Sequence, residues 1–385
     1  MNHNKQIDTS DTETSDESLG NLSESSENEV IESALFENSS EIWELEPMNG
    51  NYDPKKLDVF EENTKYKDYF YEEESYNVAV QSKKKENFVF SITMSPNDED
   101  SIYVLCHSKE KSVMKEISTT GFKISLLRKM FCKGYSIKEI LKNFDKSLTG
   151  SKHAVCLNVK EDNEILIMEK TGNVTQFKIG VLYVGEGQTK ETEFLSNQEG
   201  SSAWNEFLEI LGDKVTLMGW EGFSGGLNTK RDRSGKESIF TKWNDYEIMY
   251  HVSTLLKHSE KDPQQIVKKK HIGNDVVVII FIDGDQKYDP ESLKSKQNHI
   301  LIAVKPIIIN EETKYRVEVL TKTNVPKYEP RLPNPPIFNQ DQIRDFILTK
   351  VCQGERVAQK TGQFIERYLR FREAVLKKIV NRYIK

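Results

Sequence analysis

The feature that most constrains the fold is an unbroken apolar run at residues 276–282, which reads VVVIIFI. Successive residues of a strand face opposite sides of its sheet, so a strand without polar positions needs cover on both sides. Such a strand occupies the centre of a sheet that carries helices on both faces. We therefore predict a central, fully covered strand here and an α/β fold around it.

The segment directly before this strand is predicted to be a helix that ends in a turn. It reads DPQQIVKKKHIGND from Asp262 to Asp275. Asp262 is a typical N-cap, Pro263 suits the first helical position, and three consecutive lysines near the other end interact favourably with the helix dipole. Gly273 is expected to end the helix. Asn274 then lies at a turn whose position is fixed by the buried strand.

Several other segments fit the same architecture. A helix is predicted over residues 204–211 with Ser202 as its N-cap, because apolar residues recur there at helical spacing. Two long helices after the proline-rich stretch are predicted to close this domain. The remaining strands of the domain are predicted at residues 177–184, 215–218 and 247–252.

The chain of 385 residues is too long for a single core, since cores stop growing at roughly 250 to 300 residues. Residues 1–40 hold ten Asp or Glu against one basic residue, Lys5, which predicts a disordered acidic tail. Residues 41–160 are predicted to form a small α+β domain with strands at 87–92 and 102–106. Residues 161–385 are predicted to form the larger domain, and a strand is also expected at 165–168.

Composition excludes several classes of function. The net charge is −7, so no overall positive field favours nucleic acid. No apolar run approaches the ~20 residues that span a bilayer, so we expect a soluble, intracellular protein without a membrane span. The four cysteines are widely spaced, which argues against a metal site and a disulfide framework. A phosphate-binding P-loop is absent from the sequence, so we expect no nucleotide hydrolysis by the chain itself.

The residues alone leave two interpretations of the turn at Asn274. Asparagine is common where helices end, so the Gly-Asn pair can be an ordinary cap behind a solvated run of lysines. Alternatively, the exposed turn in front of a rigid strand is a functional site.

A resemblance favours the second interpretation. The segment from Asp262 to residue 282 resembles the catalytic motif of the Rap GTPase-activating protein family, in which a basic helix leads into His-Ile-Gly-Asn-Asp and a hydrophobic strand. Lys268 and Lys270 stand where the family has arginines. Further similar segments follow in family order from residue 165 to residue 375. They include residues 183–190, 194–197, 222–227 and 251–254.

The resemblance implies a fold and an activity. It implies a catalytic domain with a mixed central sheet flanked by helices, described as a Ras-like core, preceded by a smaller α+β dimerisation domain. The implied activity is stimulation of GTP hydrolysis by a Rap-type small GTPase in its GTP-bound form. Asn274 would be inserted as the catalytic side chain, His271 would support the helix end, and three lysines would bind the acidic GTPase surface. These lysines are Lys268, Lys269 and Lys270.

The resemblance also implies what the chain itself does not bind. GTP and magnesium belong to the partner GTPase, so no cofactor or metal is expected here. Arg231 and Arg233 are expected to be surface residues and not an arginine finger. A homodimer through the first folded domain and a cytoplasmic location, with transient recruitment to membranes carrying Rap, are expected. Two alternatives stay open: an activator of another Ras-like GTPase such as Ral or Rheb, and a non-catalytic GTPase-binding scaffold.

Overall fold

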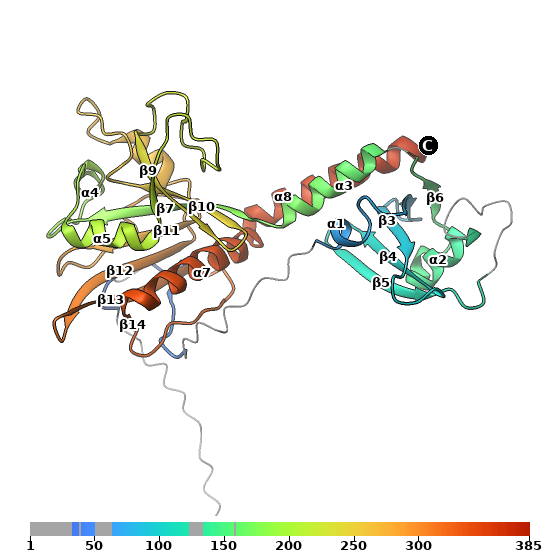
Figure 1. Cartoon of the computed structure of the whole chain (residues 1–385), viewed down its shortest axis with the longest axis horizontal. Helices are drawn as coiled ribbons and strands as arrows, with labels where there is room; N and C mark the ends of the chain where they lie inside the picture. The colour runs from blue at the N-terminus through green and yellow to red at the C-terminus, as the bar shows by residue number, and fades with distance from the viewer. Residues whose placement is uncertain (1–32, 38–39, 51–63, 123–133, 158) are drawn as a thin grey trace, which may run out of the picture. The chain divides into compact units, whose positions relative to one another are not determined.

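The computed structural model describes residues 33–37, 40–50, 64–122, 134–157 and 159–385 (Figure 1). These residues form two β-sheets with their helices, one of nine strands and one of five. Among the described helices, none is long and apolar enough to cross a membrane.

The larger sheet is mixed, as predicted. Its strand order is β1-β13-β12-β11-β7-β10-β9-β8, and β14 pairs with β13. The central strands β12, β11, β7 and β10 run parallel to one another, while β13 and β9 pair antiparallel with β12 and β10. The strands are β1 (Trp43–Leu45), β7 (Gln176–Val184), β8 (Asp213–Thr216), β9 (Glu237–Trp243), β10 (Tyr246–Val252), β11 (Val277–Ile282), β12 (Ile300–Ile309), β13 (Glu312–Lys322) and β14 (Ile337–Phe338).

Strand β11 lies at the centre of this sheet and is buried along its whole length, which confirms the prediction for residues 276–282. Its alternate residues belong to two hydrophobic clusters on opposite faces. One cluster includes helices α5 (Ser202–Leu211) and α7 (Gln340–Gln359), and the other includes α4 (Glu191–Ser196) and α6 (Ile266–Ile272). The larger sheet is therefore flanked by helices on both faces.

Helix α5 confirms the predicted helix over residues 204–211 but begins one residue earlier than expected. Ser201, and not Ser202, is its N-cap, and its hydroxyl accepts a hydrogen bond from the backbone of Trp204. The helix ends at Gly212.

The smaller sheet is antiparallel, with strand order β5-β4-β3-β2-β6. Strands β3 and β4 confirm the strands predicted at 87–92 and 102–106. One face packs against α2 (Ile137–Phe144), followed by a short 3-10 helix (Lys146–Leu148). The other packs against α1 (Lys65–Tyr69), α3 (Val159–Gly172) and α8 (Gly362–Tyr383). The strands are β2 (Ser75–Gln81), β3 (Asn87–Met94), β4 (Ser101–His107), β5 (Ser112–Ser118) and β6 (Lys152–Val155).

Two expectations about helices and strands were wrong. Residues 165–168 lie within α3 and form no strand, because a short apolar run does not by itself distinguish helix from strand. The expected boundary near residue 160 therefore falls inside a helix. Helix α8 does not close the larger domain: it lies beside α3 (Figure 1), and its Leu376 and Ile379 pack against the smaller sheet.

The N-terminal segment also differs from expectation. Residues 33–37 were predicted to be disordered, but Leu35 and Phe36 are buried in the core of the larger sheet because they are the apolar residues of an otherwise polar stretch. Most of the predicted tail lies outside the described residues. Trp43 was assigned to the smaller domain, yet β1 pairs with β13 at the edge of the larger sheet.

A buried ion pair anchors the stretch that follows β1. The Glu46 carboxylate contacts Lys350 Nζ of α7 at 2.6 Å, and both side chains are buried. Lys350 also donates to the carbonyl of Pro330. The larger sheet is thus formed by two parts of the sequence, one before and one after the residues that form the smaller sheet.

Candidate functional site

Helix α6 begins later than the sequence predicted. Its N-cap is Gln265, which has a left-handed backbone with φ of 46°, and the helix starts at Ile266. Asp262 still caps the helix from outside, because its carboxylate accepts a 2.7 Å hydrogen bond from the Ile266 amide. Pro263 lies in the turn before the helix.

Gly273 ends α6, as predicted, but without a left-handed conformation. Its φ is −70°, and its amide still donates to the Lys269 carbonyl at 2.8 Å. A Cβ at this position would lie 2.6 Å from the same carbonyl oxygen. Glycine is therefore required here by the close approach of the preceding turn.

Asn274 follows with an exposed side chain. Its Nδ2 donates a 2.7 Å hydrogen bond to the Lys270 carbonyl, so one end of the carboxamide caps the helix. Within the described residues, no hydrogen bond to its Oδ1 is present. The turn thus holds a carboxamide at the surface with its acceptor oxygen open to solvent.

Asp275 is buried directly beneath this turn. Its carboxylate contacts Lys178 Nζ at 3.2 Å and His251 Nδ1 at 2.7 Å. The same Lys178 ammonium donates to the Asn274 carbonyl at 2.7 Å. A charged group on β7 therefore fixes both the backbone of Asn274 and the acid that follows it.

His251 connects Asp275 to the glycine-containing loop at 222–227. Its Nε2 lies 3.1 Å from the Gly225 carbonyl, while its Nδ1 faces the Asp275 carboxylate. Both neighbours carry acceptor oxygens, so the ring is held between the acid beneath the Asn274 turn and the glycine-containing loop.

His271 lies behind the turn and is half-buried. Its Nε2 contacts the Ser234 hydroxyl at 3.3 Å, and its ring meets that of His251 edge-on with centroids 4.9 Å apart. Burial, and then the charges of His251, Lys270 and Lys178, lower the pKa of His271 to about 4. The ring is neutral near pH 7, so it supports the turn through packing and not through charge.

The three consecutive lysines occupy different environments. Lys268 is buried, its Nζ donates to the Asn197 carbonyl at 2.6 Å, and burial lowers its pKa to about 8. Lys269 is half-buried and pairs with Glu191 of α4 at 2.7 Å. Lys270 is exposed. Lys268 therefore does not present its ammonium at a docking surface, because the side chain points into the contact between α6 and the end of α4.

The loop between β11 and β12 supports the turn from a second side. Ser295 donates to the Gly273 carbonyl at 2.5 Å, and Asn298 Nδ2 donates to the Ile272 and Asp275 carbonyls at 3.0 and 2.6 Å. The carbonyls that flank Asn274 are thus held in place.

Four supporting residues had no role in the sequence-based prediction: Lys178, His251, Ser295 and Asn298. Lys178 carried a detectable signal, since it is the charged residue between Phe177 and Ile179 of an otherwise apolar strand. Ser295 and Asn298 lie in a loop without a recognisable pattern.

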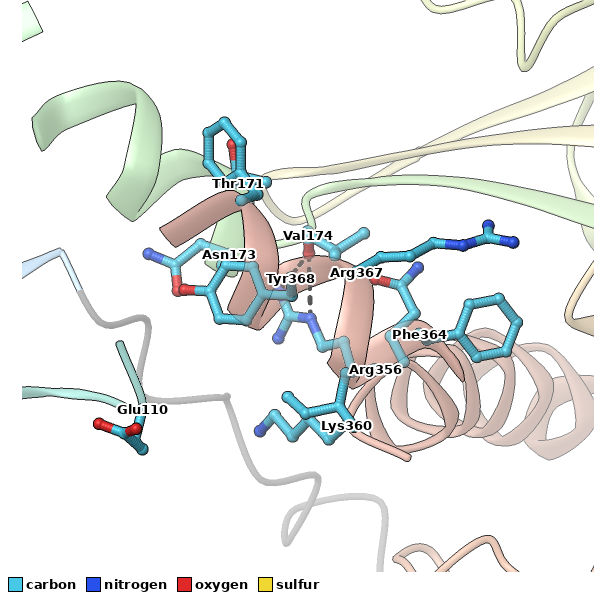
Figure 2. A pocket seen from close by; sticks show the side chains of 13 residues that line it. Glu110, Thr171, Asn173, Val174, Arg356, Lys360, Phe364, Arg367 and Tyr368 are labelled. Carbon is cyan, nitrogen blue, oxygen red and sulfur yellow. Dashed lines mark hydrogen bonds between the residues drawn. The ribbon is translucent and has the colours of Figure 1, made fainter. Parts of the chain in front are cut away.

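The described residues contain no cluster of His, Cys, Asp or Glu suited to a metal ion. A cavity of about 490 Å³ lies where α3 meets β7 and α7 meets α8, and it contains none of the Asn274 site residues. Figure 2 shows Arg356 pointing at Val174, whose carbonyl accepts from Nε at 3.0 Å and Nη2 at 2.6 Å. Arg356 of α7 thus links this helix to the segment between α3 and β7.

The part of the sequence that contains the Asn274 turn matches a known protein family. Residues 194–373 match the Rap/ran-GAP family, and this range includes α6, the turn and β11. The chain contains a Rap/ran-GAP domain.

Several relatives share this domain. The human "GTPase-activating Rap/Ran-GAP domain-like protein 3" is 32% identical over 336 residues, which cover 84% of this chain and 32% of that protein. The mouse "Signal-induced proliferation-associated 1-like protein 1" is 33% identical over 256 residues, 66% of this chain and 14% of that protein. The chain thus spans about a third or less of the length of these relatives.

One solved structure is also similar. It is titled "Structure of the TSC2 GAP domain", has 30% sequence identity and a TM-score of 0.44, and the match covers 48% of this chain and 97% of that one.

Proposed function

We propose that this Rap/ran-GAP protein stimulates GTP hydrolysis by a Rap-type small GTPase in its GTP-bound form, with Asn274 as the side chain inserted into the partner's active site. The observation that carries the proposal is an exposed carboxamide on a rigid turn: the Asn274 carbonyl is bound by Lys178, and both flanking carbonyls are bound by Ser295 and Asn298.

A carboxamide suits the chemistry. GTP hydrolysis needs an attacking water held in line with the γ-phosphate and a stabilised developing charge. The Asn274 Oδ1 can accept from that water, and Nδ2 can donate to an oxygen of the reacting group once it leaves the Lys270 carbonyl. A turn that is already fixed loses little conformational freedom on insertion, which favours the aligned complex. GTP and magnesium are supplied by the partner.

The surface around the turn offers contacts for the partner. Lys270 is exposed and Lys269 partly so, which favours an acidic GTPase surface. Ile266, at the start of the same helix, is 58% exposed and adds apolar area. Lys268 and His271 act from behind the surface, where they position α6 and the turn.

The decisive experiment is single-turnover GTP hydrolysis by purified Rap with the wild-type chain and with Asn274→Ala. We expect the variant to lose at least about 100-fold in rate, in line with removal of a preorganised polar group at a transition state, while the complex still forms. Its fold should be unchanged, because the side chain is exposed and makes a single hydrogen bond. Lys270→Met is the matched control: it should weaken binding and leave the rate at saturation unchanged.

Comparison substrates separate the alternatives. Acceleration of Ral or Rheb in preference to Rap would assign a different GTPase. A stable complex with no acceleration of any of these GTPases would support the scaffold and reduce Asn274 to a helix cap.

The proposal also covers assembly and place of action. Helices cover both faces of the smaller sheet, and no described strand pairs with the outer edge of β5. We therefore propose that two copies of the chain form a homodimer through this edge. Light scattering of the full chain at several concentrations tests it, and a monomer throughout would refute it. Action on Rap would take place in the cytoplasm, at membranes that carry Rap.

A further inference from the structure

Residues 33–37, here called the strap, are bound by a buried acid of the larger sheet. Glu318 of β13 accepts hydrogen bonds from the Ser33 hydroxyl at 2.5 Å, from the Ala34 amide at 3.2 Å and from the Leu35 amide at 3.1 Å. The Glu318 side chain is fully buried. The strap is therefore held by a carboxylate that has little access to water.

Ser33 is the centre of this contact. Its hydroxyl donates to Glu318 and also accepts from the amides of Leu35 and Phe36, at 3.3 and 2.8 Å. Its carbonyl accepts from Lys287 Nζ at 2.7 Å. One hydroxyl thus sets the conformation of the strap and fastens it to the sheet.

The remainder of the strap binds the loop that follows β11. Tyr288 donates its amide to the Leu35 carbonyl at 2.8 Å and accepts from the Glu37 amide at 3.0 Å. The Phe36 ring packs edge-on against the Tyr288 ring. Further along the chain, Trp43 Nε1 donates to Glu291 of the same loop at 3.1 Å.

This loop leads directly to the Asn274 turn. Ser295 and Asn298, a few residues after Glu291, donate to the carbonyls that flank Asn274. Leu35, Phe36 and Leu293 of the loop share one hydrophobic cluster with Ile272 of α6. The strap and the turn are therefore connected through one continuous stretch of chain and one packed core.

We propose that Ser33 is a modification site, and that phosphorylation of its hydroxyl detaches the strap and loosens the Asn274 turn. An ATP-dependent protein kinase would be the enzyme. A bond forms between Ser33 Oγ and the terminal phosphorus of ATP, the bond from that phosphorus to ADP breaks, and the hydroxyl proton passes to a base of the kinase. The consequence for activity rests on the proposed function.

The charges around Ser33 determine the direction of the effect. A phosphate adds about −1.5 to −2 charges and removes the hydroxyl proton that Glu318 accepts. The new charge would lie directly against a buried carboxylate, and this repulsion is costly where water is excluded. Two cations face the site, but Arg316 already pairs with Glu318 and Lys287 is bound to the Ser33 carbonyl. Repulsion therefore exceeds attraction, and the strap leaves.

The test uses the full chain with phosphoserine placed at position 33 during translation. Amide hydrogen exchange should increase at Leu35, Glu37 and Tyr288, which report docking of the strap, and at Asn274 and Asp275, which report the turn. The stimulated rate of GTP hydrolysis should fall by about tenfold, a typical coupling between two sites. Phosphoserine at Ser202, an exposed serine at the start of α5, is the control and should change neither readout.

A second variant separates repulsion from simple loss of the hydroxyl. Glu318→Gln in the phosphoserine-33 protein replaces the carboxylate by an amide that can donate to phosphate, so docking should be partly restored. Ser33→Ala should increase exchange less than phosphoserine does.

Three results would overturn the proposal: unchanged exchange at the strap, tighter docking through Lys287 and Arg316, or a detached strap with an unchanged turn. If the wild-type chain fails to stimulate any GTPase, the proposed function fails, while the exchange measurements still decide whether Ser33 controls the turn.

Discussion

Asp275→Asn tests whether the buried acid beneath the turn is what holds the turn in place. The substitution keeps the size of the side chain and removes its charge. The Asp275 side chain is 0% exposed, and its two partners, Lys178 and His251, are 35% and 2% exposed. The variant therefore removes the carboxylate that a buried histidine ring and a partly buried ammonium contact.

The expected cost follows from this burial. Removal of one partner from a buried ion pair costs about 3 to 5 kcal/mol. Asparagine still provides one acceptor and Lys178 can be hydrated, so we expect about 3 kcal/mol, the lower end of that range. The variant should also lose GTPase stimulation, because the Lys178 contact to the Asn274 carbonyl is no longer oriented by the acid.

Urea unfolding monitored by circular dichroism measures the first effect, and single-turnover hydrolysis measures the second. Glu191→Gln is the matched control, since it also converts an acid to its amide, at a residue that pairs with Lys269 of α6. Its pair with Lys269 is partly exposed, so it should cost about 0.5 kcal/mol. If Asp275→Asn destabilises the protein no more than Glu191→Gln does, the turn is not held by buried charge.

Three further predictions concern other buried groups. Lys268→Met should change the free energy of unfolding by about 1 kcal/mol or less in urea titrations, because the methionine fills the same space and the lost ammonium was buried with a single carbonyl partner, Asn197. Burial raises the pKa of Glu355 from 4.5 to about 8, so the folded state retains a proton that the unfolded chain releases, and stability should fall as the pH rises from 4.5 to 8. Glu355→Gln should flatten that profile in unfolding measurements at several pH values. Arg356→Ala should destabilise the protein by about 2 kcal/mol and increase amide exchange around Val174, since two charged hydrogen bonds to that carbonyl are lost.

The sequence was most informative where one physical requirement dominated. Residues 276–282 have no polar position, so they had to be covered on both sides, and the structure places them at the centre of the larger sheet. The same reasoning identified the helix and turn before them, since Gly273 and the cationic helix end are local signals. The role of Asn274 came from the family resemblance and stays a prediction.

Local patterns failed where tertiary contacts decide the outcome. The apolar run at 165–168 is compatible with helix and strand alike. It forms a helix whose apolar residues pack against Val89 and Leu105 of the smaller sheet. Lys268 looked like a surface cation among three, although it is buried against Asn197. The supports of the turn, such as Asn298, come from segments distant in sequence, which no single-sequence pattern brings together.

The position of β1 limits how the chain can be divided. A fragment that begins at residue 161 contains the whole Rap/ran-GAP match but lacks Glu46, so Lys350 would be left as a buried charge without its acid. It would also expose the edge of β13 and the Glu318 carboxylate that the strap covers. Such a fragment should be prone to association at its new sheet edge. The larger sheet of this protein is therefore formed by segments that are adjacent in space but separated in the sequence.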